Sequence, residues 1–328
     1  MHKFIIKRLL LSVVILFFVA FIIYVLMRCL PTSYIESMAR QKSMQPGSKT
    51  FEEWIAQLSA TYGMDQGIVP GFFAWLGKAL TGEFGDSWKW TEPVLDVFNN
   101  TIWISFIMGA IAFVLELIIA IPLGIIAATK QYSKTDYTVS VIALAGISLP
   151  TFFFASLLKL LFSVRLGWFD LFGLTGRDYQ NLSAMGQFWD KAHHLVLPIV
   201  TLVVISIGSL MRYTRTNMLE VLNADYIRTA RAKGVSERKV IYKHAFRNTL
   251  IPLVTIIGGS LPGLFSGALI TETLYSIPGI GYTSYQSMTG GDIPFSMFYL
   301  SFLAVLTLLG NLIADILYAV VDPRVRIS

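Results

Sequence analysis

The chain has 328 residues, of which 55% are hydrophobic and only 14% are charged. An average soluble domain carries about 25% charged residues, so much of this surface must face lipid instead of water. This composition excludes an ordinary soluble domain. The net charge of the chain is +6.

Six apolar runs approach the length of about 20 residues that one helical membrane span needs. They cover residues 9–27, 101–128, 139–164, 195–210, 250–270 and 295–321. The fourth run is short and holds Pro198 and Gly208, and the third is interrupted by Pro150, so five or seven spans are alternatives. We therefore predict an all-α polytopic membrane protein with about six transmembrane helices.

Basic residues near membrane ends predict the orientation of the spans, because Lys and Arg in short loops mark the cytoplasmic side. Lys3, Lys7 and Arg8 precede the first run, and this run is too long for a signal peptide and lacks an A-x-A site. Nine basic residues lie between Arg212 and Arg247. Both termini and the loop 212–249 are therefore expected in the cytoplasm. The basic residues of this loop could also indicate binding of a nucleic acid, but we favour a loop that its positive charge keeps on the cytoplasmic side.

Residues 31–100 form a mixed-polarity insertion on the opposite, external side. Apolar residues from Phe51 to Tyr62 recur at helical spacing and predict a short amphipathic helix. The tryptophans at 54, 75, 88 and 90 fit either an aromatic belt at the headgroups or contacts with a partner. This suggests three parts: the tail and first helix over 1–30, the external insertion over 31–100, and a core permease domain over 101–328.

The stretch from 223 to 252 predicts two helices joined by a glycine turn. Asn223 is a candidate N-cap, Gly234 is placed to end the first helix in a left-handed conformation, and Ser236 can cap a second helix to about Asn248. Ala230 and Gly234, four residues apart, would leave one face open to another backbone. The hairpin is either a knob that docks into an acidic partner or a solvated loop.

This stretch closely resembles the EAA loop of binding-protein-dependent ABC transporter permeases, in the variant of the peptide and nickel subfamily. The matching residues are Asp225 to Gly234, Glu237, Val240, His244, Ala245, Arg247, Asn248 and Pro252. Further similar segments are Tyr62 to Asp65, Gly82 to Ser87, His194 to Pro198, Glu272 to Gly281, Asp292 to Pro294 and Asp322 to Arg324. The large external insertion resembles the B-type instead of the C-type subunit of the pair.

The resemblance implies a type I ABC importer permease fold in the inner membrane and a non-catalytic role. The chain has no G-x-x-x-x-G-K-[ST] phosphate loop, so ATP and Mg²⁺ are expected on partner ATPases and no cofactor on this chain. Implied partners are a C-type permease subunit, two ATP-binding subunits and an extracytoplasmic solute-binding protein. The implied cargo is a di- or oligopeptide, with nickel or glutathione as alternatives. The lack of a His or Cys cluster on the external side favours peptides over nickel.

Candidate site residues follow from the resemblance and from charges inside the predicted spans. For coupling to the ATPases we name Asp225, Arg228, Ala230, Arg231, Gly234, Glu237 and His244, and for a pathway or outer gate Glu116, Glu272, Pro278 and Gly279. No catalytic residue and no metal ligand are predicted.

Four residues carry more specific expectations. Glu116 would either line the pathway or bond a neighbouring helix, since charges within a membrane are functional candidates. Lys159 is expected to snorkel outward. His193 and His194 are adjacent, are expected on different helix faces, and would make a poor metal pair.

Two other classes of membrane protein fit less well. An ion-coupled secondary transporter would show inverted repeats and paired broken helices, which the sequence lacks. A membrane enzyme would show an H-E-x-x-H, a G-x-S-x-G or a carboxylate cluster at a membrane face, and none is found.

Overall fold

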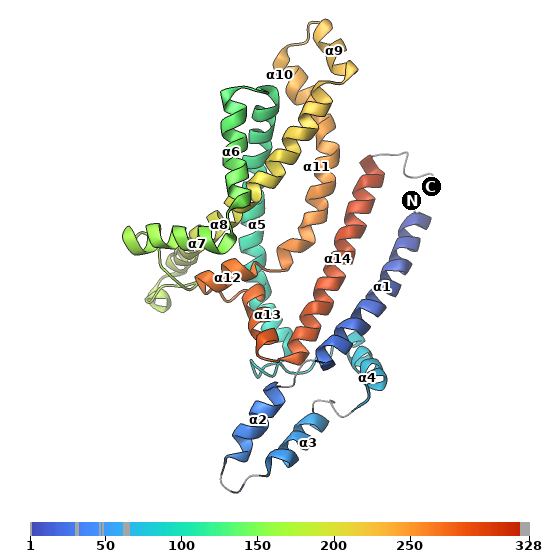
Figure 1. Cartoon of the computed structure of the whole chain (residues 1–328), viewed down its shortest axis with the longest axis vertical. Coiled ribbons are helices and arrows are strands. Elements are labelled where there is room, and N and C mark those ends of the chain that lie inside the picture. The colour runs from blue at the N-terminus through green and yellow to red at the C-terminus, as the bar shows by residue number, and fades with distance from the viewer. Residues whose placement is uncertain (1, 30–32, 46, 48, 62–65, 322–328) are drawn as a thin grey trace. The chain divides into compact units, whose positions relative to one another are not determined.

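The computed structural model describes residues 2–29, 33–45, 47, 49–61 and 66–321 (Figure 1). These residues form helices and connecting turns, with one isolated bridge between Asp86 and Pro93. Helices suit a lipid environment because they satisfy the backbone N–H and C=O groups within one segment. The family-like segments 62–65 and 322–324 lie outside the described residues. The chain divides into two compact units, Met1–Ile102 with Thr283–Leu309 and Trp103–Tyr282 with Gly310–Ser328.

The first unit combines the N-terminal helix, the insertion over residues 31–100 and part of the C-terminal helices. Its elements are α1 (His2–Cys29), α2 (Ser33–Ser43), α3 (Phe51–Thr61), α4 (Ile68–Leu80), the start of α5 (Val94–Thr129), most of α13 (Ile280–Thr289) and the first part of α14 (Ile293–Val321). The amphipathic helix predicted from Phe51 is confirmed as α3. Tyr24, Phe72 and Trp88 belong to the buried core of this unit. Trp88 is therefore a core residue of the chain itself, which the predicted aromatic belt does not account for.

The second unit is a helix bundle. Its elements are the rest of α5, α6 (Lys134–Ser148), α7 (Thr151–Leu158), a π-helix η1 (Lys159–Arg165), a 3-10 turn η2 (Tyr179–Asn181), α8 (Ala184–Leu222), α9 (Asp225–Ala232), α10 (Glu237–Lys239), a π-helix η3 (Val240–Ala245), α11 (Phe246–Ser260), a 3-10 helix η4 (Leu261–Phe265) and α12 (Leu269–Tyr275). Figure 1 shows α5, α6 and α8 running beside one another, with α9 beyond the end of α8.

Four of the described helices are long and apolar enough to cross a membrane: α1, α5, α8 and α14. Two bent pairs raise this number to six if each pair forms one span, as the sequence predicts. The 39 residues of α8 would extend about 58 Å, well beyond a hydrocarbon core of about 30 Å. The ends of α8 therefore reach outside the bilayer.

The third apolar run is not one straight span. Its two halves, Lys134–Ser148 and Thr151–Arg165, meet at an angle of 102°. Proline disfavours the helical conformation in the residue before it, and Leu149 is extended, with φ −77° and ψ 125°. Pro150 thus ends α6 and starts α7, which lies across α6 in Figure 1.

Glycines allow α6 and α8 to approach closely. A Cβ at position 146 would lie 2.8 Å from the carbonyl oxygen of Val204. A Cβ at position 208 would meet the carbonyl oxygen of Ala143 and lie 2.6 Å from Cγ1 of Ile147. Backbone atoms cannot move away as a flexible side chain can, so both positions require glycine.

We expect Gly208→Ala to destabilise the bundle by about 1–3 kcal/mol, the usual cost of overpacking. Gly77→Ala in α4 is the matched control, because a Cβ there has nothing within 4 Å and alanine is the better helix former. Thermal unfolding of the purified protein in detergent measures both. Equal melting temperatures for the two variants would contradict the close packing of α6 and α8.

Candidate functional site

The segment after α8 folds into the helical hairpin that the sequence predicts, with one difference at its start. Asn223 is the C-cap of α8, and its side-chain amide donates to the Leu219 carbonyl oxygen at 3.0 Å. Ala224, in an extended conformation, takes the N-cap position of α9 instead. The predicted N-cap is therefore wrong, because α8 continues farther than its apolar run and uses Asn223 for its own end.

The turn between the two helices depends on Gly234. Its φ of +74° lies in the left-handed region that only glycine adopts without strain, as predicted. Ser236 is the next N-cap, although its side chain makes no capping bond. The second helix does not stop at Asn248: helical structure continues through η3 and α11, which contains Pro252. Gly234 follows the end of α9, so the turn removes it from the helical face of Ala230.

A bidentate ion pair closes the hairpin. Arg231 Nε and Nη2 donate to the two carboxylate oxygens of Glu237 at 3.1 and 2.6 Å. This hydrogen bond raises the pKa of Arg231. Both side chains are about half exposed, so the pair contributes little to stability, about 0–1 kcal/mol. Its effect is to fix the orientation of the two helices across the turn.

The base of the hairpin packs on the end of the bundle. Ile227 of α9 and Val240 of η3 are fully buried with Ile125 of α5 and Met218 of α8. Ala230 is half-buried against this cluster, which makes it partly a packing residue. Asp225, Arg228, Arg231, Gly234 and Glu237 are exposed, while His244 is half-buried. The hairpin therefore presents a charged outer surface from an ordered base.

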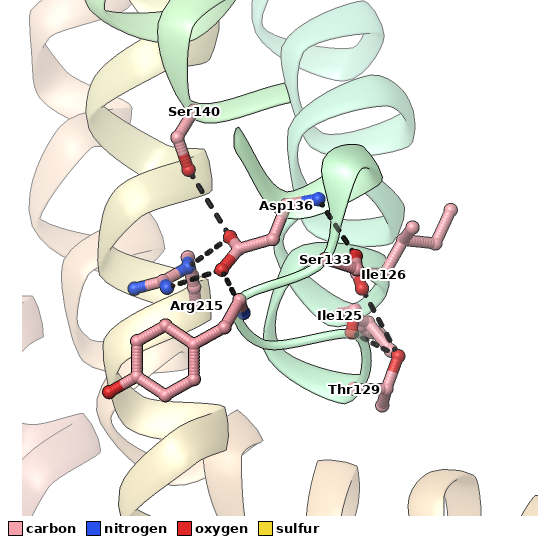
Figure 2. A network of polar contacts seen from close by, with 8 residues as sticks. Ile125, Ile126, Thr129, Ser133, Asp136, Ser140 and Arg215 are labelled. Atoms are coloured by element: carbon pink, nitrogen blue, oxygen red, sulfur yellow. Dashed lines mark hydrogen bonds and ion pairs between the residues drawn. The ribbon is translucent and has the colours of Figure 1, made fainter. Parts of the chain in front are cut away.

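Next to this cluster, α6 is joined to α8 through a buried carboxylate (Figure 2). Arg215 donates from Nε and Nη2 to Asp136 at 2.7 and 2.8 Å. The Tyr132 backbone N–H and the Ser140 hydroxyl donate to the same carboxylate at 3.0 and 3.3 Å. Ser133 caps α6 by accepting from the Asp136 backbone N–H. Neither Asp136 nor Arg215 was predicted; the S-x-x-D pattern could have indicated the cap, but not the ion pair.

Glu116 of α5 faces a cavity of about 210 Å³ within the second unit. Ser206 of α8 lines the same cavity. The cavity is also lined by Ser105, Gly263 and Gly267, and the Ser105 hydroxyl is already engaged by Glu272. Glu116 therefore borders a cavity beside α8, and its role in the translocation pathway stays a prediction.

Glu272 is fully buried and serves as a centre of hydrogen bonds. It accepts from the Ser105 hydroxyl at 2.7 Å and from the backbone N–H groups of Ala268 and Tyr282, both at 2.8 Å. A Cβ at Gly279 would lie 2.6 Å from Cδ of Glu272. Pro278 lies between the helices α12 and α13. Glu272 holds α5, α12 and α13 together instead of pointing into open space.

Asp292 plays the corresponding part in the first unit. It accepts from the Ser87 hydroxyl, and from the backbone N–H groups of Trp88 at 3.1 Å and Phe295 at 3.3 Å. Burial raises the pKa of Asp292, against the lowering effect of these hydrogen bonds. Lys89 also donates to the Gln286 carbonyl oxygen at 2.8 Å. The insertion is thereby tied to the junction of α13 and α14.

Lys159 does not snorkel into the surroundings as expected. Its ammonium donates to the Leu274 carbonyl oxygen and lies 3.8 Å from the ring centre of Phe172. Carbonyl and aromatic partners within the bundle stabilise the charge more directly than a reach to the interface.

The adjacent histidines also differ from expectation. One ligand atom each from Asp170, His193 and His194 lies within 4.8 Å of the other two. Consecutive helical positions diverge at Cβ, but the segment with Asp170 packs over this turn of α8 and both rings reach it. This grouping could not be predicted from the sequence, because Asp170 is more than twenty residues away from the two histidines.

Comparison with known proteins identifies the family of this bundle and its hairpin. Residues 120–327 match the family described as the inner membrane component of binding-protein-dependent transport systems. Residues 1–117 match the N-terminal part of the membrane component of such systems. The chain belongs to this family, and it is a multi-pass, non-catalytic permease subunit of an ABC importer that works with separate ATPase subunits.

Individual relatives cover almost the whole chain. The oligopeptide transport system permease protein AppB of Bacillus subtilis is 36% identical over 327 residues, 99% of this chain and 100% of AppB. OppB of Salmonella typhimurium is 33% identical over the same shares. The dipeptide transport system permease protein DppB of Alkalihalophilus pseudofirmus is 33% identical over 85% of this chain and 88% of its own. The predicted family resemblance is confirmed.

A solved structure supports the fold. The inward-facing methionine ABC transporter MetNI has a chain that matches with a TM-score of 0.52 and 18% identity, covering 70% of this chain and 97% of its own. The predicted importer permease fold is confirmed.

The ion pair between α6 and α8 yields a stability prediction. Asp136 is 4% exposed and Arg215 25%, so we expect Arg215→Ala to cost about 3–5 kcal/mol by leaving a buried carboxylate unpaired. Asp136→Ala combined with Arg215→Ala should lose less than the sum of the two single variants. Arg228→Ala, which removes an exposed ion pair, is the control. Additive losses in thermal unfolding would mean that the two side chains act independently.

Proposed function

We propose that this chain is the B-type permease subunit of an importer for di- or oligopeptides. The cargo is supported by the relatives, which are named as oligopeptide and dipeptide permease proteins at 31–36% identity. In this proposal it pairs with a C-type permease subunit, two ATP-binding subunits and an extracytoplasmic solute-binding protein, and it lies in the cell membrane with both termini in the cytoplasm.

The observation that carries the coupling role is the shape of the hairpin after α8. Its buried base joins α5, α8 and α9, while Arg231, Gly234 and Glu237 remain exposed on its outer surface. A docked ATPase would therefore press on a rigid element that continues directly into α8. Such rigid-body displacement of packed helices is a common route to alternating access.

Nickel remains the main alternative cargo. The sequence argument against nickel was the lack of a His or Cys cluster on the external side, and the structure groups Asp170, His193 and His194 in a segment predicted to be external. That argument no longer supports peptides. The peptide proposal rests on the relatives alone, so cargo has to be measured directly.

We expect the assembled transporter in proteoliposomes to hydrolyse ATP faster when the binding protein and a peptide mixture are present. Gly234→Trp should abolish this stimulation, since a bulky side chain on the exposed turn blocks docking. Gly47→Trp is the control, because this glycine has a similar φ of +75° and nothing within 4 Å. If nickel alone stimulates ATP hydrolysis, nickel is the cargo and the peptide proposal is wrong. If stimulation by peptides survives Gly234→Trp, the proposed coupling surface is wrong.

Glu116 is proposed to face the cargo from its cavity. There its carboxylate would accept hydrogen bonds from the ammonium group of a peptide. A hydrogen bond to a charged group contributes about 1.5–3 kcal/mol, so Glu116→Gln should lower the uptake of a peptide with a free amino terminus by roughly tenfold. The control is Glu220→Gln, at an exposed position on α8. If an N-acetylated peptide loses as much uptake as the free one, or neither loses any, Glu116 does not bind the amino group.

A further inference from the structure

The segment after η1 and the first part of α8 bring three metal-binding residue types together. Asp170, His193 and His194 each offer a ligand atom, and these atoms lie within 4.8 Å of one another. In a tetrahedral zinc site with bonds of about 2.0–2.2 Å, neighbouring ligand atoms lie about 3.3–3.6 Å apart. His194 Nε2 and Asp170 Oδ2, at 3.2 Å, are close to this spacing.

The hydrogen bonds around the two rings fix which nitrogen is free. His194 Nδ1 lies 2.8 Å from the Asp190 carbonyl oxygen, and His193 Nε2 lies 3.0 Å from the Trp168 carbonyl oxygen. A carbonyl oxygen only accepts, so each of these nitrogens carries a hydrogen. The lone pairs are then on His194 Nε2 and His193 Nδ1. Metal-binding histidines are commonly oriented by a bond of this kind from the other ring nitrogen.

This assignment leaves an unfavourable contact that a cation would relieve. The lone pair of a neutral His194 Nε2 faces a carboxylate oxygen of Asp170, and two acceptors at 3.2 Å repel each other. A metal ion between them turns the repulsion into attraction. The side chain of His194 is only 2% exposed, so its ring cannot turn away into water.

Neighbouring groups hold the three residues in place. The ring of Phe169 stacks on His193 with a centroid separation of 4.7 Å. Asp190 accepts from the Gly176 backbone N–H at 2.8 Å, which ties the same segment to α8 at a second point. Asp170 is exposed, so an ion can enter and a water molecule can complete its coordination.

We propose that Asp170, His193 and His194 bind a divalent transition metal of the zinc class, which fastens segment 166–183 to α8. Two imidazoles and one carboxylate suit Zn²⁺ far better than Mg²⁺ or Ca²⁺, which prefer oxygen ligands alone. The ion remains in place as part of the permease, and the proposal is independent of which solute is carried.

The test uses the whole transporter, purified in detergent and stripped with EDTA. Zn²⁺ is added, free metal is removed, and bound zinc is measured by mass spectrometry and by titration calorimetry. We expect one more equivalent of Zn²⁺ per complex for the unmodified protein than for Asp170→Ala or His193→Ala, with affinity at least about tenfold weaker in each variant. Mg²⁺ in excess should not compete.

Asp178→Ala is the matched control, since Asp178 is an exposed carboxylate of the same segment outside the cluster. His244 and His2 are retained in every variant, so their background binding is equal. Zn²⁺ should also slow backbone hydrogen exchange across 166–176 in the unmodified protein and the control only. Metal-free melting temperatures show whether each variant is folded.

Two results would overturn the proposal. Zinc binding that is equal in the unmodified protein, Asp170→Ala and His193→Ala places the ion elsewhere. No zinc bound by the unmodified complex at micromolar concentration means that the three residues do not form a metal site. Neither result bears on peptide-stimulated ATP hydrolysis, so this inference and the proposed function fail separately.

Discussion

A carboxylate removed from water must receive hydrogen-bond donors, and this requirement organises both units of the chain. Glu272 satisfies it with Ser105 and two backbone N–H groups, and Asp292 with Ser87 and backbone N–H groups of both flanking segments. Asp136 uses Arg215. In each case at least one donor comes from an element distant in sequence, so the buried carboxylate joins segments that are far apart in the chain. Losing one of these carboxylates would leave the other two intact, but the segments that meet at the lost carboxylate would no longer be held together.

Helix contacts between these centres are close because small residues and proline occupy the right positions. Gly208 and Gly146 let the backbones of α6 and α8 approach each other closely, and Pro150 turns the chain by 102° immediately afterwards. Interfaces of small residues are typical of helices in lipid, where no hydrophobic effect drives helices together. The bundle is thus held together by close packing and by a few polar bonds. The same interactions make the hairpin after α8 rigid.

The sequence predicted the local features of the candidate site and missed those that depend on distant pairs. Gly234 in a left-handed turn follows from residue type alone, because only glycine adopts that conformation cheaply. The bond between Arg231 and Glu237 spans six residues and needs the turn to be closed first. Asn223 was misassigned because a cap at the end of one helix and the start of another looks the same in sequence.

By itself, the sequence determined the class of the protein, its all-helical membrane character and its family. Composition and hydropathy show directly that much of the chain faces lipid and not water. The motif residues of the hairpin are contiguous in sequence, so the family can be recognised without the fold. Only the tertiary structure decided that Glu272 is a buried junction, that Lys159 bonds a carbonyl group, and that His193 and His194 meet Asp170. These outcomes depend on which segments lie side by side, and hydropathy carries no information about the partner of a polar side chain.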